Sequence, residues 1–167
     1  GINFDRSFME AFVRPGLEFS NWHERGIYME CGVLQTSPEE ISLFGMEHKD
    51  LPTMRIRRYS LRTDGFVSMN AGFDGGEFTT HPMLFEGSEL ELNYSTSAVG
   101  SVRVEIQDAD GNALPGFGLE DCPEKFGDEI EGVMTWKGGA SLGDLAGKPV
   151  RLRVALKDAD LYAFRFR

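Results

Sequence analysis

The sequence is poor in the residues that build metal centres and nucleophilic active sites. It has two cysteines and three histidines among 167 residues. Cys31 and Cys122 are too far apart for a zinc site, which needs closely spaced ligand pairs. We expect two separate buried thiols, and a single disulfide remains an open alternative. The chain has no G-x-S-x-G elbow and no histidine arrangement from which a catalytic triad could be proposed.

The sequence also lacks long apolar runs and an excess of basic residues. No apolar stretch approaches the roughly 18 to 20 residues that a membrane helix needs, and no basic-then-apolar leader is present. Acidic residues outnumber basic ones by 27 to 17, so the formal net charge is -10. Such a charge repels phosphate backbones and anionic lipids. We therefore expect neither nucleic acid nor membrane as a partner, while neutral glycans stay open.

Alternating apolar and polar residues dominate the rest of the chain. Val102, Val104 and Ile106 alternate with polar residues, and the segment 150–156 repeats this pattern. No segment sustains the 3.6-residue period of a long helix. Together with twenty glycines and seven prolines, the pattern predicts an all-β protein built as an antiparallel, jelly-roll-like β-sandwich. We expect further strands at 27–35, 40–47, 78–85, 89–95, 130–136 and 162–166, and one helical turn at 141–145.

One stretch changes the phase of its alternation. Met54 and Ile56 lie in one phase, whereas Tyr59 lies in the other. A period of two changes phase when one residue is inserted, so we predict a β-bulge or strand break near Arg57–Arg58. The same pattern places a domain boundary close to 51–53.

The charged residues of this stretch have an ordinary explanation. Arginines at 55, 57, 58 and 62 could indicate an anion site, but the chain carries 27 acidic residues. We therefore expect these arginines to form ion pairs at the surface.

Several motifs resemble a known family. The segment FMEAFVRPG at 8–16 is similar to the final blade of five-bladed-propeller glycoside hydrolases of the invertase and arabinanase type. RRYSLRTDGFVS at 57–68 resembles the junction that leaves this blade, and the segments 79–117 and 127–166 resemble the β-sandwich appended to it. The resemblance implies a bacterial protein whose last-blade segment spans 1–52 and whose β-sandwich domain spans 53–167.

The resemblance also implies that this chain is not an enzyme by itself. Glycosidases of this type use a pair of carboxyl groups, and the resemblance places both upstream of Gly1. We expect a non-catalytic accessory domain that packs on and stabilises the catalytic propeller, which predicts an exposed apolar surface on the first fifty residues. The alternative is a carbohydrate-binding module that targets the parent enzyme to polysaccharide. An exported, periplasmic or extracellular parent is implied, and the compartment stays open.

Four residues are candidates for carbohydrate binding. An exposed aromatic ring can pack on the C–H groups of a sugar, and Trp22, Tyr94 and Trp136 could provide one. His48 is added because final-blade histidines of the resembling propellers can point toward the central channel. Three alternatives remain open: Trp136 in the sandwich core, Trp22 in contact with the missing propeller, and His48 as a surface residue.

The D-x-D-G-N run at 108–112 invites a calcium interpretation. An EF-hand loop needs glycine at its sixth position and glutamate at its twelfth. Here Gly111 is the fourth residue and Leu119 the twelfth. A hairpin turn explains the run, because both turn residues tolerate positive φ. We expect no cofactor, and a structural calcium ion held by other acids stays open, for which the sequence offers Asp121, Asp128 and Glu129.

Overall fold

The computed structural model describes residues 9–22 and 26–167 and divides the chain into two compact units. The first unit is Gly1–Thr63 and the second is Asp64–Arg167. Strands dominate both, in two antiparallel sheets, one of which curls. This confirms the predicted all-β, sandwich-like class. Within the described ranges, no helix has the length and apolar character needed to cross a membrane.

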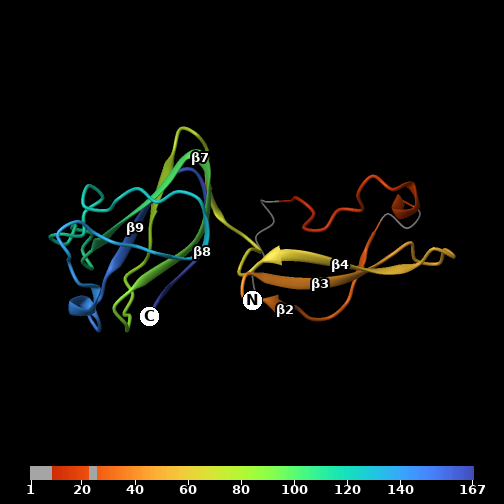
Figure 1. Cartoon of the computed structure of the whole chain (residues 1–167), viewed down its shortest axis with the longest axis horizontal. Coiled ribbons are helices and arrows are strands. Elements are labelled where there is room, and N and C mark those ends of the chain that lie inside the picture. The colour runs from red at the N-terminus through yellow and green to blue at the C-terminus, as the bar shows by residue number, and fades with distance from the viewer. Residues whose placement is uncertain (1–8, 23–25) are drawn as a thin grey trace. The chain divides into compact units, whose positions relative to one another are not determined.

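The first unit is a small sheet built around one central strand. β3 pairs with β4 along one edge and with β1 and β2 along the other, all antiparallel (Figure 1). The strand expected at 27–35 is therefore two short strands, between which Gly32 adopts a φ of 108°. The elements are η1 (Phe19–Trp22), β1 (Tyr28–Met29), β2 (Leu34–Ser37), β3 (Glu40–Glu47) and β4 (Arg55–Arg62).

The β3–β4 ladder corrects two predictions. Its register runs without a shift from Glu40 opposite Arg62 to Glu47 opposite Arg55, so the bulge predicted near Arg57–Arg58 is wrong. The alternation of apolar and polar residues changes phase because the face of β4 that carries Ile56 is exposed. On an exposed face both apolar and polar side chains are tolerated, so the alternation does not report the register. The segment 48–54 connects two paired strands, so the chain divides after Thr63 and not near residue 52.

The second unit is a five-stranded sheet dominated by two long strands. β7 and β9 pair with each other along most of their length, β8 flanks β7, and β5 and β6 flank β9. Segments expected as separate strands, 89–95 with 102–108 and 150–156 with 162–166, are continuous here. The elements are β5 (Met69–Ala71), β6 (Gly76–Thr79), β7 (Leu90–Gln107), β8 (Asp128–Val133), η2 (Leu142–Leu145) and β9 (Arg151–Phe166).

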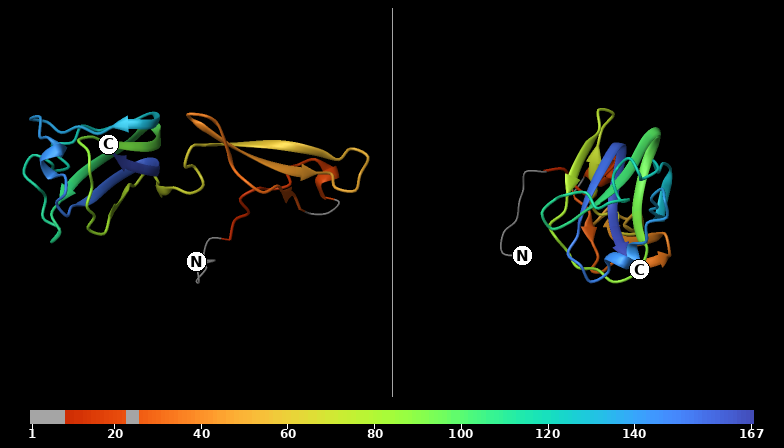
Figure 2. Two further views of the ribbon diagram at one scale, coloured as in Figure 1. Left: turned by 90° about the horizontal axis from the view of Figure 1, so that it is seen from below. Right: turned by 90° about the vertical axis from the view of Figure 1, so that its left-hand side faces the viewer.

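This sheet curls at a bulge halfway along its two long strands (Figure 2). The β7–β9 register shifts between Thr96 and Ser101. Opposite this point Asp158 takes a φ of 43°, a left-handed conformation that non-glycine residues rarely adopt. A Cβ on Gly100 would overlap the carbonyl oxygens of Lys157 and Asp158. Glycine at this position therefore allows the two strands to approach closely at the bend.

The curled sheet encloses a continuous core of nineteen buried side chains. Alternate residues of β7 and β9, such as Val104 and Leu152, point inward, as the sequence pattern predicts. Phe85, Phe117 and Trp136, which lie outside the strands, cover them. Gln107 bridges to Ala113 around the turn at 108–112, which confirms the hairpin.

Candidate functional site

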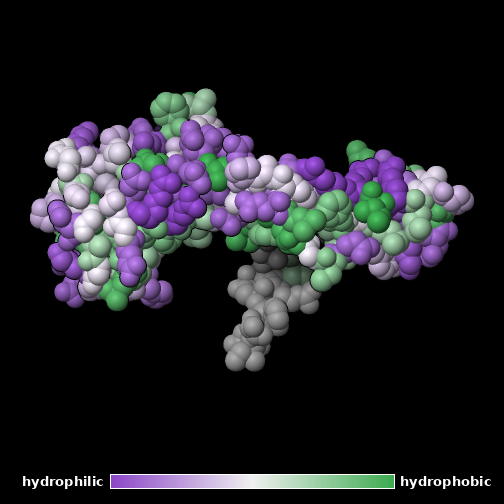
Figure 3. Space-filling model, turned by 60° about the horizontal axis from the view of Figure 1, so that its bottom comes forward, coloured by the Kyte–Doolittle hydropathy of each residue, from purple (hydrophilic) through white to green (hydrophobic). Residues whose placement is uncertain are grey.

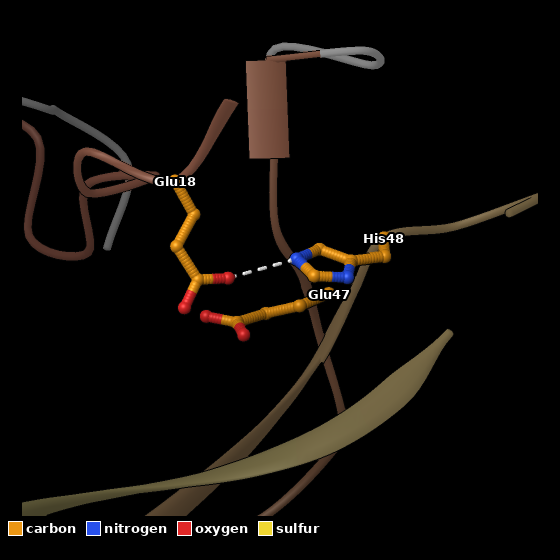
Figure 4. A group of neighbouring side chains, drawn as sticks. All are labelled: Glu18, Glu47 and His48. Carbon is orange, nitrogen blue, oxygen red and sulfur yellow. Dashed lines mark hydrogen bonds and ion pairs between the residues drawn. The ribbon is translucent and has the colours of Figure 1, made fainter. Parts of the chain in front are cut away.

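A cluster of charged side chains surrounds the end of β3 in the first unit. Glu47 is its last residue, and His48 follows with a φ of 55°. This left-handed conformation turns the chain away from the strand. Both side chains are buried, and both lie beside the carboxylate of Glu18 (Figure 4). The site thus joins the end of the sheet to the segment that precedes η1.

His48 links three parts of the first unit. Its Nε2 donates to the Glu18 carboxylate at 3.1 Å, and its Nδ1 lies 3.0 Å from the hydroxyl oxygen of Thr53. Both ring nitrogens are therefore engaged. The predicted candidate His48 is therefore buried within this cluster and is not a surface residue. Its role in carbohydrate binding stays a prediction.

Glu47 is held by side chains from the neighbouring strand. Arg55 lies opposite Glu47 in the β3–β4 ladder, and Arg57 and Tyr59 follow at intervals of two on the same face. The Nε atoms of the two arginines lie 3.0 and 2.9 Å from the Glu47 carboxylate, and the Tyr59 hydroxyl donates to it at 2.8 Å. With an exposure of 2%, Glu47 is a buried anion whose charge these neighbours compensate.

Burial, hydrogen bonds and neighbouring charges shift the pKa values of Glu18, Arg55 and Tyr59 in this site. Burial opposes ionisation of Glu18, but hydrogen bonds and the charge of Arg55, with His48 and Arg57, hold the pKa of this carboxyl below its usual value. The hydrogen bond to Glu47 raises the pKa of Arg55. Burial, followed by the Glu47 hydrogen bond and charge, raises the pKa of Tyr59 to about 12. At neutral pH the carboxylate of Glu18 is ionised and Tyr59 is protonated.

This arrangement suits an ion-pair network better than a metal centre or a hydrolytic site. One ligand atom from each of Glu18, Glu47 and His48 lies within 4.8 Å of the others, a spacing that a cation could bridge. Guanidinium groups already occupy the carboxylates, however, with Arg55 at 2.6 Å from Glu18, and they repel a second cation. Glycoside hydrolysis needs one carboxyl that stays protonated, whereas the Glu18 carboxyl is shifted toward ionisation.

The aromatic candidates for sugar binding separate into two kinds. Tyr94 is 2% exposed and Trp136 is 7% exposed, and both belong to the core of the second unit. Neither ring offers an open face on which a sugar could stack, and Trp136 lies in the core as the alternative interpretation held. Trp22 is 53% exposed, and its indole N–H donates to the carbonyl of Gly16. It remains the one platform candidate with an accessible ring.

The sequence analysis missed most of this network. Nothing in the sequence linked Glu18 or Glu47 to His48. A signal existed in the spacing Arg55-x-Arg57-x-Tyr59, which places three polar groups on one face of a strand. The arginines pair with acids as expected: Arg55 and Arg57 with Glu18 and Glu47, and Arg58 with Glu40.

The two cysteines are free thiols in the structure. Cys31 is exposed, so the expected pair of buried thiols is correct only for Cys122. The Cys122 sulfur accepts a hydrogen bond from the Val104 amide at 3.3 Å, and burial raises the pKa of this thiol. A protonated, buried thiol is a poor nucleophile, so Cys122 belongs to the core.

Comparisons with protein-family models, curated proteins and solved structures find no match to this chain.

Proposed function

We propose that this chain is a non-catalytic accessory module of a glycoside-hydrolase-like protein, in which the first unit packs on a five-bladed propeller. One observation carries the proposal: in the described part of the first unit, Ile41 is the only buried hydrophobic side chain. A sheet that buries so little apolar surface lacks the main driving force for folding alone. It needs a partner surface, and the resemblance of the sequence motifs points to a propeller.

The apolar surface of the first unit is continuous across its sheet. Tyr28 lies opposite Met46, and Met46 lies opposite Ile56, so one apolar row crosses β1, β3 and β4 on a single face. Ile56 is 65% exposed. Figure 3 shows such hydrophobic side chains in green on the right-hand part of the view. An apolar face of this kind marks an interaction surface.

Other residues of the first unit also expose large apolar side chains. Large exposed hydrophobic side chains are frequent in the described residues before Thr63: Met9, Phe12, Leu17, Phe19, Trp22, Tyr28, Met29, Val33, Leu34, Met54 and Ile56. The exposed apolar surface predicted for the first fifty residues is therefore present. This surface supports a role in packing against a partner. That the partner is a propeller is our proposal.

The ion-pair network supports a structural role for the first unit. Glu18 and Glu47 share Arg55 and Arg57, so the network ties the segment before η1 to the sheet. The alternative, a carbohydrate-binding platform, loses support because Tyr94 and Trp136 are buried.

The test mixes the intact chain with a propeller of the invertase or arabinanase type. The final-blade strands of this propeller have been deleted. We expect co-elution in size-exclusion chromatography and a higher melting temperature for the complex. Ile56→Asp, in the apolar row, should weaken the complex. Phe126→Asp, at an equally exposed aromatic of the second unit, should leave it unchanged.

A parallel assay measures release of reducing sugar from soluble polysaccharides by the chain alone. We expect none. Release of sugar would overturn the proposal. It would also be overturned if the first unit were monomeric and resistant to protease and did not bind the propeller.

A further inference from the structure

We propose that two copies of this chain pair through the outer edge of β4, so that their first units form one continuous antiparallel sheet. β4 bonds to β3 along one edge, and among the described residues no strand pairs with its other edge. The described segment before η1 meets β4 through the Glu18 side chain and forms no backbone hydrogen bond with it. An unpaired strand edge is a template for a further strand. This interface goes beyond packing on a propeller, because it needs no second kind of protein.

The β3–β4 ladder shows which backbone groups of β4 point outward. The Thr63 amide donates to the Glu39 carbonyl at 2.9 Å and extends the register of the ladder, so the odd-numbered residues of β4 bond to β3. In an antiparallel pair, alternate residues of a strand turn their amide and carbonyl groups to opposite sides. These groups of Ile56, Arg58 and Ser60 therefore point away from β3, and in the described part of the chain no hydrogen bond to them is formed.

The charged side chains of β4 leave this edge open. Arg55 and Arg57 pair with Glu47 of β3. Arg58 pairs with Glu40 of the same strand. The three guanidinium groups are thus drawn across β3, and their charges are compensated. Sheet edges are usually protected by charged side chains, prolines, bulges or short strands, but β4 has eight residues, no proline and no bulge.

The other edge strands are shorter or acidic. β1, β2, β5 and β6 have two to four residues each. β8 has six residues, of which Asp128, Glu129 and Glu131 are acidic. Nine acidic and eight basic residues give the first unit a formal charge of -1, whereas eighteen and nine give the second unit -9. Two copies therefore repel each other least where their first units meet.

The arginines select one register for the pair. Two identical strands pair antiparallel about a two-fold axis. An axis at Tyr59 places Arg58 of one copy opposite Ser60 of the other. Moving the axis by one residue places Arg58 opposite Arg58 or opposite Arg62 of the other copy, and like charges directly opposite each other destabilise a sheet. The axis at Tyr59 avoids both arrangements and overlaps the two strands over nearly their whole length.

Sedimentation equilibrium of the intact chain measures the association. A reducing agent prevents a disulfide through the exposed Cys31. We expect the mass to rise from 18.6 kDa to twice this value, with a dissociation constant on the order of 10 µM, because small interfaces are weak. A chain that stays monomeric at about 1 mM, far above this constant, would overturn the proposal.

Amide hydrogen exchange followed by NMR locates the interface. We expect the amides of Arg58 and Ser60 to exchange at least about tenfold more slowly in the dimer than in the monomer, because pairing adds hydrogen bonds to them. The Tyr59 amide, which faces β3, is the internal control. If the chain dimerises while the Arg58 and Ser60 amides keep their monomer rates, the copies meet through another surface and the edge proposal is wrong.

Charge substitutions at Ser60 test the register. Each substitution acts twice in a symmetric dimer. Ser60→Glu, opposite Arg58 of the second copy, should tighten association about fivefold, and Ser60→Arg should weaken it about fivefold. Thr79→Glu and Thr79→Arg, in the edge strand β6 of the second unit, are the matched controls and should leave association unchanged. Equal dissociation constants for the two Ser60 variants would contradict the register and with it the proposal.

A proline substitution tests the backbone contact itself. Ser60→Pro removes an outward amide, which a strand tolerates where the N–H faces away from its ladder, and should weaken association at least about tenfold. Ser60→Ala keeps the amide and should associate like the unchanged chain. Equal association of both variants would show that the edge amide takes no part. None of these measurements contains a propeller, so packing on a propeller is decided by its own test.

Discussion

The two units of this protein use the same local contacts but differ in whether they have a core. The second unit buries nineteen hydrophobic side chains, whereas the described part of the first buries Ile41 alone. Their charges differ as well. Nine acidic and eight basic residues give the first unit a formal charge of -1, against -9 for the second. The acidic surplus therefore belongs to the unit that is folded around its own core.

Each unit contains a buried glutamate clamped by two arginines spaced two residues apart. In the first unit Glu47 is held by Arg55 and Arg57. In the second, Glu91 lies 2.6 Å from Arg165 and 2.9 Å from Arg167. Both glutamates are 2% exposed. In a strand, the i, i+2 spacing places both guanidinium groups on the face that carries the acid.

Each unit also packs a tyrosine ring over a glycine of the neighbouring strand. A Cβ on Gly45 would lie 3.1 Å from the Tyr59 ring, and a Cβ on Gly132 would lie 2.5 Å from the Tyr94 ring. Glycine leaves room for the ring in both cases. The comparison teaches that such local contacts order a sheet but do not replace buried apolar area, which provides most of the folding free energy.

The largest effect should come from cutting the chain between Thr63 and Asp64. We expect residues 64–167 to unfold in one cooperative transition and residues 1–63 to lack one, because among the residues that the structure describes only those of the second unit enclose a core. Circular dichroism during thermal unfolding measures both fragments. A cooperative transition of the isolated first unit would abolish the distinction between the units.

The second largest effect should come from truncation of a core side chain, which should destabilise the second unit alone. Leu152→Ala removes a fully buried side chain of the second unit, and we expect a loss of about 2–5 kcal/mol in the free energy of unfolding. Urea denaturation of the whole chain measures this loss. Ile41→Ala, in the first unit, is the control and should leave that transition unchanged.

The buried glutamate of the second unit should have a smaller effect. Glu91→Gln places an amide group against Arg165 and Arg167, and we expect a loss of about 1–3 kcal/mol. The exposed Glu86 provides the control Glu86→Gln, with a change within about 0.5 kcal/mol. If both variants melt alike, the clamp contributes no stability.

The smallest effect should appear at alkaline pH in the first unit. The pKa of Tyr59 is raised to about 12 from a usual value near 10. Because the folded-state pKa is the higher one, the stabilisation is complete below pH 10 and is lost as the pH rises to about 12. Burial raises the pKa of Tyr94 as well, so ultraviolet titration should show a late tyrosine step whose amplitude Tyr59→Phe reduces. A late step of unchanged amplitude in the variant would contradict the assignment.

The sequence predicted those parts of the fold that depend on neighbours in the chain. The alternation in 102–106 and 150–156 identified strands of the core, and the Asp108 turn was recognised from its glycine. The curl of the sheet was not predicted, because it depends on Gly100 meeting a strand that lies far along the chain. The prediction of a bulge near Arg57 was wrong because Ile56 is exposed. The position of an exposed apolar residue in the alternation does not show which face of the strand is buried.

The candidate site was predicted less well. His48 was singled out by resemblance, but its partner Glu18 lies thirty positions earlier in sequence, and no local pattern joins them. Tyr94 and Trp136 were offered as sugar platforms because residue type alone does not reveal burial. Side chains from distant segments meet only once the sheet register is set.

The bend at Gly100 has a consequence for how the second unit folds. In the β7–β9 ladder, Gln107 and Arg151 are the partners closest in sequence, and Leu90 and Phe166 are the most distant. We expect pairing to spread from the closest partners past the bend, so a chain stalled at the bend would leave the first half of β7 unpaired. Nearly all pairing is between distant residues, and we expect this unit to fold in milliseconds to seconds, as other proteins of high contact order do.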